Sequence, residues 1–255
     1  MLKIEATPDL DFSELNKKIH ESAEKHIRIT NAIGQRYIGS GLSGRKIEIE
    51  GTPGNALGAY LDGSTIIVEG NVQDATGDTM NGGEIIVHGN AGDATGYAMR
   101  GGEILIRGNT GYRAGIHMKA YKSQQPAVIV GGKAGSFLGE YQAGGTIIVL
   151  NLKPPVTIDG KIVAGSPVER DITGAFVGTG MHGGAIYLRT DVKPVLPKQI
   201  KVTMCKGVDI PEIKSYITKF CNCFPDVNKD EIFESMFAVL KPDSKNPYKQ
   251  LYTTN

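Results

Sequence analysis

The chain has 255 residues, enough for one or two domains with a sizeable hydrophobic core. Its apolar runs are far shorter than the roughly 20 residues of a membrane-spanning helix, and its polar first residues predict no secretory signal peptide. The formal charge is only +1, with acids and bases mixed along the chain, so no basic patch indicates nucleic-acid binding.

The first predicted element is a helix over about residues 12–26. Asp11 or Ser13 can cap its N-terminus. Its apolar stripe, at helical spacing, consists of Leu15, Ile19 and Ala23. We assign residues 1–26 to an N-terminal helical segment.

A repeat of about 19 residues follows, over residues 27–190. Each repeat holds a short apolar strand, and the strands begin at Ile27, Ile47, Ile66, Ile85, Ile104, Val128, Ile147 and Ile186. If each repeat makes one turn around an axis, equivalent strands stack about 4.8 Å apart, and crossovers between parallel strands are right-handed. The repeat therefore predicts an all-β fold, a right-handed parallel β-helix (solenoid) of about seven coils with short helical additions at both ends.

Glycine makes up 34 residues, about twice its usual share of roughly 7%, and it recurs at fixed places between the strands. Two columns four residues apart are the predicted structural turn glycines: Gly54, Gly58, Gly77, Gly92, Gly96, Gly111, Gly115, Gly135, Gly139, Gly174 and Gly178. Such positions need glycine because φ is positive or because neighbouring backbones approach closely. An apolar column that follows is expected to fill the interior: Leu61, Met80, Met99, Met118 and Met181.

The first and third residues of each strand are apolar and predict its buried face, whereas the second and fourth should point outward. The second-residue column is nevertheless aliphatic in the central strands: Ile67, Ile86, Leu105, Ile129 and Ile148. We call this column the apolar strip. Such a strip is a contact surface, so we expect the chain's own helices or a partner to cover it, with self-association left open. The fourth-residue column is polar, as a solvated face should be: Thr30, Glu50, Glu69, His88 and Arg107.

Two insertions interrupt the repeat, one of about five residues at 119–126 and one of about 20 residues at 151–173, with a hairpin turn predicted at Asp159-Gly160. After residue 190 glycine nearly disappears, and Pro194 and Pro197 mark a linker. Helices are predicted over about 211–220 and 228–240. We assign 191–255 to a C-terminal helical extension packed on the β-helix, because it is too small for a large core of its own.

Candidate metal ligands are few. His88 and His117 lie in different columns, so we predict no shared metal ion. Cys221 and Cys223 form a C-x-C pair that lacks the further ligands of a closed zinc site. Together with Cys205 they are expected to be free thiols in a reducing, cytoplasmic compartment.

Motifs for other chemistry are equally sparse. Asp74 and Asp93 recur within the sequence DATG, and calcium binding by such stacked acids remains an alternative. No hydrolase, metalloprotease or phosphate-loop motif is present, so we predict no catalytic, cofactor-binding or metal-binding residue in this chain.

One cluster is both basic and aromatic and lies at the repeat that carries the first insertion. It comprises Tyr112, Arg113, His117, Lys119, Tyr121 and Lys122. Such a cluster is a solvated loop, or a contact site for a partner subunit or an acidic substrate. Arg113, His117, Lys119 and Lys122 therefore join the apolar strip as candidate partner contacts.

The glycine columns follow the pattern G-x-x-G-x-x-x-G-x-x-M-x-G-G. Over about residues 27–189 this resembles the GXGXG domain, the C-terminal β-helix of glutamate synthase large subunits. The segment KPDSKNPYKQLY near the end resembles stand-alone members of that group. The resemblance implies a separately encoded, non-catalytic structural subunit.

In that family the domain lies beside a glutamine amidotransferase domain and an FMN-binding synthase domain, and it holds their active sites in place. The resemblance therefore implies a role in nitrogen metabolism as part of an oxidoreductase complex. It implies no cofactor in this chain and FMN and iron–sulfur groups in amidotransferase-like and synthase-like partners. Three alternatives remain: the equivalent scaffold of formylmethanofuran dehydrogenase, the equivalent part of N-methylglutamate synthase, and an independent β-helix enzyme acting on polysaccharide.

Overall fold

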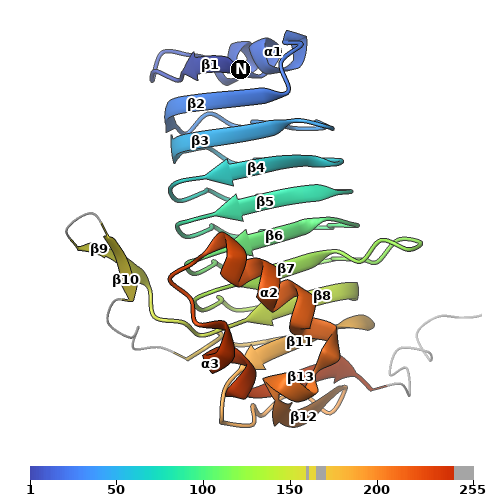
Figure 1. Ribbon diagram of the computed structural model, residues 1–255. Coiled ribbons are helices and arrows are strands. Elements are labelled where there is room, and N and C mark those ends of the chain that lie inside the picture. The colour runs from blue at the N-terminus through green and yellow to red at the C-terminus, as the bar shows by residue number, and fades with distance from the viewer. Residues whose placement is uncertain (159–160, 165–170, 244–255) are drawn as a thin grey trace, which may run out of the picture.

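The computed structural model describes residues 1–158, 161–164 and 171–243. Over these residues one sheet of eleven strands runs through the molecule in the order β1-β2-β3-β4-β5-β6-β7-β8-β11-β13-β12, and β9 and β10 form a separate pair (Figure 1). The strands are β1 (Leu2–Glu5), β2 (His26–Ile33), β3 (Lys46–Thr52), β4 (Ser64–Val68), β5 (Gly83–Val87), β6 (Glu103–Ile106), β7 (Ala127–Val130), β8 (Ala143–Val149), β9 (Pro155–Ile158), β10 (Lys161–Ala164), β11 (Gly183–Arg189), β12 (Ile200–Lys206) and β13 (Met236–Pro242). The helices are α1 (Phe12–Glu21), α2 (Lys214–Cys223) and α3 (Lys229–Glu234).

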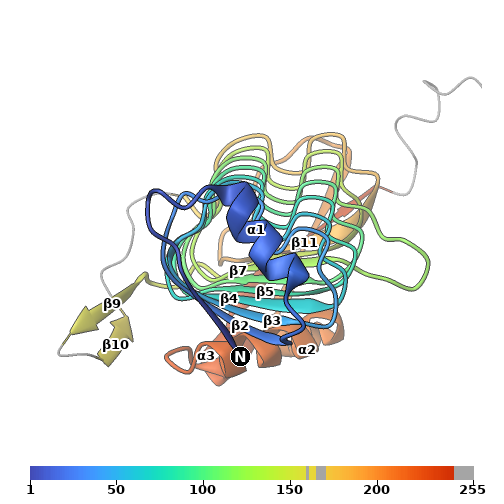
Figure 2. The same cartoon turned by 90° about the horizontal axis from the view of Figure 1, so that it is seen from above.

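This topology corrects the prediction of an all-β fold in the form of a right-handed parallel β-helix. The strands form one mixed sheet, parallel from β1 through β8 to β11 and antiparallel where β13 joins β11 and β12, with short helices packed on it. The fold is thus α/β-like. Each repeat adds one strand, and the rest of the repeat returns in turns on the side of the sheet opposite α2 and α3 (Figure 2).

Backbone conformation explains why these return segments are turns. In one repeat Ala56, Gly58 and Tyr60 have φ of 61°, 64° and 58°, so every second residue is left-handed. An extended strand cannot contain such residues. The turns instead stack through backbone hydrogen bonds, as where the Ala56 amide donates to the Asp74 carbonyl at 2.9 Å.

The predicted strands are present and in register, although each begins one to four residues earlier than predicted, as where β8 starts at Ala143 and not at Ile147. Ile47 pairs with Ile66, Ile66 with Ile85, and Ile85 with Ile104. The first and third strand residues and the methionine column fill one core between the sheet and the turns, and Met80, Met99 and Met118 are fully buried there. In the eighth strand's repeat the methionine position holds Gln142, which is buried and donates to the carbonyls of Gly144 and Gly145 at 3.1 Å.

The N-terminal helix is shorter than predicted. Asp11 accepts the Ser13 amide at 2.8 Å and caps α1, which ends at Glu21. Leu15 and Ile19 are fully buried in the main core, and Figure 2 shows α1 lying across its end. The preceding strand β1, which pairs in parallel with β2, was not predicted.

The C-terminal extension departs furthest from the predicted helices. The first becomes a 3-10 turn (Pro211–Ile213) followed by α2. The second ends at Glu234, and its last part is strand β13, which also pairs with the unpredicted β12. The apolar run Met236–Leu240 suits a strand buried between two others better than one stripe of a helix.

The insertion at 151–173 contains the antiparallel pair β9–β10, in which Ile158 lies opposite Lys161. This pairing agrees with the predicted hairpin. The turn residues Asp159 and Gly160, like the tail segment 244–255, lie outside the described residues. No helix in the described part of the chain combines the length and apolar character needed to cross a membrane.

The two glycine columns serve two different purposes. Gly77 and Gly115, at φ of 70° and 68°, belong to the column that needs a left-handed backbone. Gly135 belongs to the other column, where a Cβ atom would lie 2.5 Å from the Gly111 carbonyl oxygen and 2.8 Å from the Tyr112 nitrogen. There a side chain would push neighbouring repeats apart.

We expect Gly135→Ala to lower the free energy of unfolding by about 3 kcal/mol, because the added methyl group meets backbone atoms that cannot rotate away. The matched control is Gly82→Ala, whose Cβ would meet only the Asp62 side chain, at 3.1 Å, among atoms nearer than 3.5 Å. It should change stability by less than about 1 kcal/mol. Urea unfolding of both variants measures the difference, and equal values would contradict the close-approach explanation.

Candidate functional site

The apolar strip is covered within the chain. Leu105, Ile129 and Ile148 are fully buried and Ile86 is nearly so, while Ile67 is half-buried. They form one hydrophobic cluster with residues of the C-terminal extension: Ile210, Ile213, Ile217, Phe220, Phe224, Ile232 and Phe237. The hypothesis of an internal cover is confirmed. As partner contacts, the four buried members of the strip are excluded.

A buried ion pair fastens this cover to the sheet. The Arg107 Nε and Nη2 atoms donate to Asp226 Oδ2 at 2.9 and 2.6 Å, and Nη1 donates to the Lys153 carbonyl at 3.2 Å. The side chains of Arg107 and Asp226 are only 4% and 13% exposed. The expectation that Arg107 lies on a solvated face is therefore wrong, because the extension covers this end of its strand.

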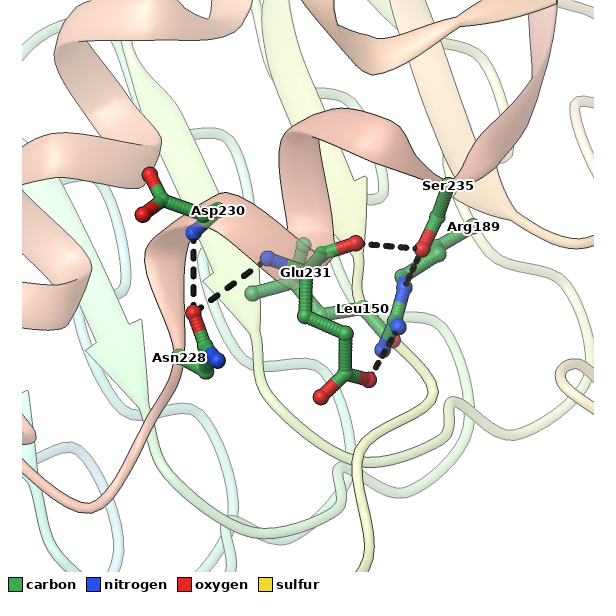
Figure 3. A network of polar contacts seen from close by, with 6 residues as sticks. All are labelled: Leu150, Arg189, Asn228, Asp230, Glu231 and Ser235. Atoms are coloured by element: carbon green, nitrogen blue, oxygen red, sulfur yellow. Dashed lines mark hydrogen bonds and ion pairs between the residues drawn. The ribbon is translucent and has the colours of Figure 1, made fainter.

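A second arginine of the same column binds α3 (Figure 3). Arg189 donates to Ser235 Oγ at 2.8 Å, to Glu231 Oε1 at 2.6 Å and to the Leu150 carbonyl at 3.4 Å. The Asn228 side chain caps α3 by accepting from two backbone amides of its first turn. Arg189 thus holds α3 against the sheet through Glu231 and Ser235, and the Asn228 cap stabilises the helix start.

These two arginines line a cleft of about 680 Å³ beside the root of the β9–β10 insertion. Lys153, Asp226 and Glu234 also line it. Both guanidinium groups already donate to carboxylates of the C-terminal extension. The cleft therefore follows the line along which the extension packs on the sheet.

Lys219 of α2 makes a third attachment. Its ammonium group donates to Glu84 at 2.6 Å and to Glu103 at 2.8 Å, on neighbouring strands. Burial works against the charged form, but hydrogen bonds to Glu103 and Glu84 outweigh it and raise the pKa of Lys219. The extension is thus held by an apolar cluster with ionic contacts around it.

The candidate metal ligands have structural partners. The His88 ring meets the Phe224 ring edge-on, with centroids 5.1 Å apart. Asp74 Oδ1 accepts the Asp93 amide at 2.8 Å, and Asp93 Oδ1 accepts the Tyr112 amide at 2.7 Å. Among the described residues, no three His, Cys, Asp or Glu side chains are grouped closely enough to hold a metal ion.

The three cysteines are free thiols, each partly buried. Burial is the main cause that raises the pKa of Cys205 and Cys223, and it raises the pKa of Cys221 from 9.0 to about 11. A raised pKa keeps the thiol protonated, which disfavours both metal ligation and nucleophilic attack.

We expect Cys221, left as the sole thiol by serine substitution of Cys205 and Cys223, to react slowly with DTNB at pH 8. A pKa of about 11 in place of 9.0 lowers the thiolate fraction, and with it the rate, about 100-fold relative to the unfolded chain. Because the pKa of Cys221 is higher in the folded chain than in the unfolded chain, protonation of this thiol contributes fully to the free energy of unfolding below pH 9. The contribution falls as the pH rises towards 11. Equal rates in buffer and in urea would contradict this.

Two of the predicted basic and aromatic residues, Arg113 and His117, lie on the turn side of the molecule in two stacked columns. Arg113 lies over the Phe137 ring at 4.8 Å and pairs with Glu140 at 3.2 Å, and Phe137 stacks on Phe176 at 4.9 Å. The parallel column, four residues on, stacks His117 on Tyr141 at 5.2 Å.

Further residues extend this surface. Tyr97 meets the His117 ring edge-on at 5.9 Å. Lys119 follows two residues after His117 and opens the five-residue insertion, in which Lys122 lies 5.2 Å from the Tyr121 ring centroid. We call this surface the aromatic–basic face: Tyr97, Arg100, Tyr112, Arg113, His117, Lys119, Tyr121, Lys122, Phe137, Tyr141 and Phe176.

The structure thus unites Arg113 and His117 with aromatic residues that the sequence cluster omitted. Phe137 and Tyr141 lie 24 residues after Arg113 and His117, the interval between the strand starts Ile104 and Val128. Alignment of the repeats by their strands would have revealed this stacking.

Comparisons with known proteins agree with the repeat. A family model described as the GXGXG motif matches residues 13–242. An uncharacterized protein of Methanocaldococcus jannaschii is 42% identical over 255 residues, an alignment that covers 96% of this chain and 94% of the relative. The chain belongs to the GXGXG motif family.

Proposed function

We propose that this chain is a non-catalytic structural subunit of a glutamate-synthase-like complex. It would associate with a glutamine amidotransferase-like subunit and an FMN-binding synthase-like subunit, which supply the active sites and the cofactors. The observation that carries the proposal is the match to the GXGXG motif over residues 13–242, most of the chain. The glutamate-synthase context follows from the resemblance of this motif.

The physical character of the fold supports a spacer role. Successive repeats are joined twice, by strand pairing in the sheet and by backbone hydrogen bonds between the turns. The C-terminal extension lies over the apolar strip and so crosses several strands. Its residues Asp226, Glu231 and Lys219 form ion pairs with residues of the sheet side. Such a body resists bending, as is needed to keep two active sites at a fixed separation.

The test is an affinity purification of the tagged full-length chain from its own cells, with copurifying proteins identified and flavin measured by absorbance. We expect an amidotransferase-like chain and an FMN protein in fixed ratio with this chain, and glutamine-dependent glutamate formation by the complex. Copurification with molybdenum or tungsten proteins would replace the proposal by a formylmethanofuran dehydrogenase-like role. Recovery of the chain alone at native concentration would overturn the proposal.

A further inference from the structure

We propose that the aromatic–basic face is the surface by which this chain binds a partner protein, and that the partner presents carboxylates together with apolar side chains. The inference rests on the proposed function, because the partner is one of the two other members of that complex. It assigns the contact to the turn side, away from the face that the C-terminal extension already covers.

The first argument is exposure. Phe176 is 62% exposed, Tyr112 54% and Tyr141 46%, although the chain has a large core available. Tyr97 and Tyr121 are also exposed. Aromatic side chains gathered on one surface are typical of protein contacts, where they supply most of the binding energy.

The second argument is backbone strain. Phe137 and Phe176 have φ of 63° and Tyr141 has φ of 54°, the left-handed region that costs a bulky residue about 1–2 kcal/mol. The same columns also hold Tyr37 and Tyr60 in the first repeats but Ala94 and Gly180 in others, so the turn accepts an aromatic ring without needing one. Ring stacking on an exposed surface returns only about 0.5–1.5 kcal/mol. What sets Phe137, Phe176 and Tyr141 apart from Tyr60 is that their rings stack on neighbouring side chains into one exposed surface, and binding accounts for such a surface where folding does not.

The third argument is charge. The turns 94–100, 111–122 and 135–141 carry four cations, Arg100, Arg113, Lys119 and Lys122, and one carboxylate, Glu140. This excess disfavours a second copy of the same face and favours an acidic partner. Four cations on a chain of net charge +1 are also a small footprint for nucleic acid, which favours a protein partner.

The test measures binding of purified full-length chain to each of the two partner proteins by biolayer interferometry. The key variant is Phe137→Gly/Phe176→Gly, because glycine prefers the positive φ at both positions and the fold should remain within about 1 kcal/mol of wild type. We expect its affinity for one partner to fall at least 30-fold, the loss typical of hot-spot residues. Tyr60→Gly is the control: it removes an exposed aromatic residue at φ of 58° from an earlier repeat and should bind as wild type.

A second variant tests the charge argument. Lys119→Glu/Lys122→Glu should weaken binding about tenfold at low salt and less at high salt, since rim charges act mainly on association. Unchanged binding would contradict the acidic chemistry of the partner.

The outcomes separate the two proposals. If wild-type chain binds neither partner, the proposed function fails. If wild-type chain binds but the double glycine variant binds equally well, the proposed function stands and this inference is overturned. It is likewise overturned if the face instead mediates self-association, seen as a mass change by light scattering that the variant abolishes, or binds a 20-nucleotide oligo(dT) probe.

Discussion

Asp226→Ala is expected to lower the free energy of unfolding by about 3–5 kcal/mol. Asp226 is the only carboxylate that Arg107 contacts among the described residues, and both of its hydrogen bonds come from the same guanidinium group. The substitution leaves a positive charge buried at 4% exposure without its counter-ion. Guanidinium chloride unfolding followed by circular dichroism measures the effect as a shift of the midpoint.

Two further variants test this explanation. Glu50→Ala removes a carboxylate from the Arg28–Glu50 pair, in which both side chains are nearly half exposed, and should cost less than about 1 kcal/mol. The double variant Arg107→Met/Asp226→Leu removes both charges and should recover most of the stability lost by Asp226→Ala. A double variant as unstable as the single one would show that packing, and not the unpaired charge, causes the loss.

The repeat made the positions of the central strands predictable. A period of 19 residues with an apolar residue at its start fixes the register, because any slip of one residue would turn each strand's core residues outward. The architecture was less predictable. The pattern of glycines fits the corners of a parallel β-helix and a series of turns equally well, and only the positive φ of every second residue, as at Ala75, Gly77 and Thr79, decides for turns.

Long-range contacts explain the other differences. Arg107 reads as a surface residue within its repeat, and its burial depends on a residue 119 positions further along the chain. For a related reason the sequence predicted only part of the aromatic–basic face. Tyr112 to Lys122 are neighbours in sequence, whereas Phe137 and Phe176 join them only when successive turns stack.

The placement of the two surfaces gives the proposed scaffold a physical logic. The apolar strip, which would otherwise promote aggregation, is closed by the chain's own extension. The turn side keeps exposed aromatic rings that the fold does not require. A partner bound there would meet a surface supported by the full stack of repeats, so a force on the face would be spread over many backbone hydrogen bonds.

Phe220→Ala should lower the free energy of unfolding by about 3–5 kcal/mol, because it removes a fully buried ring from the centre of the cover. The ring lies tilted against that of Phe224, with centroids 4.6 Å apart, and its Cζ atom lies 2.9 Å from the place where Gly131 would carry a Cβ. Phe220 thus fills the space that this glycine leaves open in the sheet face. Thermal and denaturant unfolding measure the loss, with Tyr60→Ala as an exposed aromatic control that should cost less than about 1 kcal/mol.

The same variant also tests whether the extension is held mainly by its apolar contacts. With Phe220 gone, the ion pairs of Lys219 and the buried Arg107–Asp226 pair remain, but the partly exposed Lys219 pairs contribute little, and a buried pair that keeps both partners adds little net stability. Trypsin should therefore cleave within 201–229 faster than in wild type while the repeats stay folded. Unchanged cleavage with a stability loss below about 1 kcal/mol would instead assign the attachment to the buried Arg107–Asp226 pair, and Asp226→Ala should then be the variant that frees the extension.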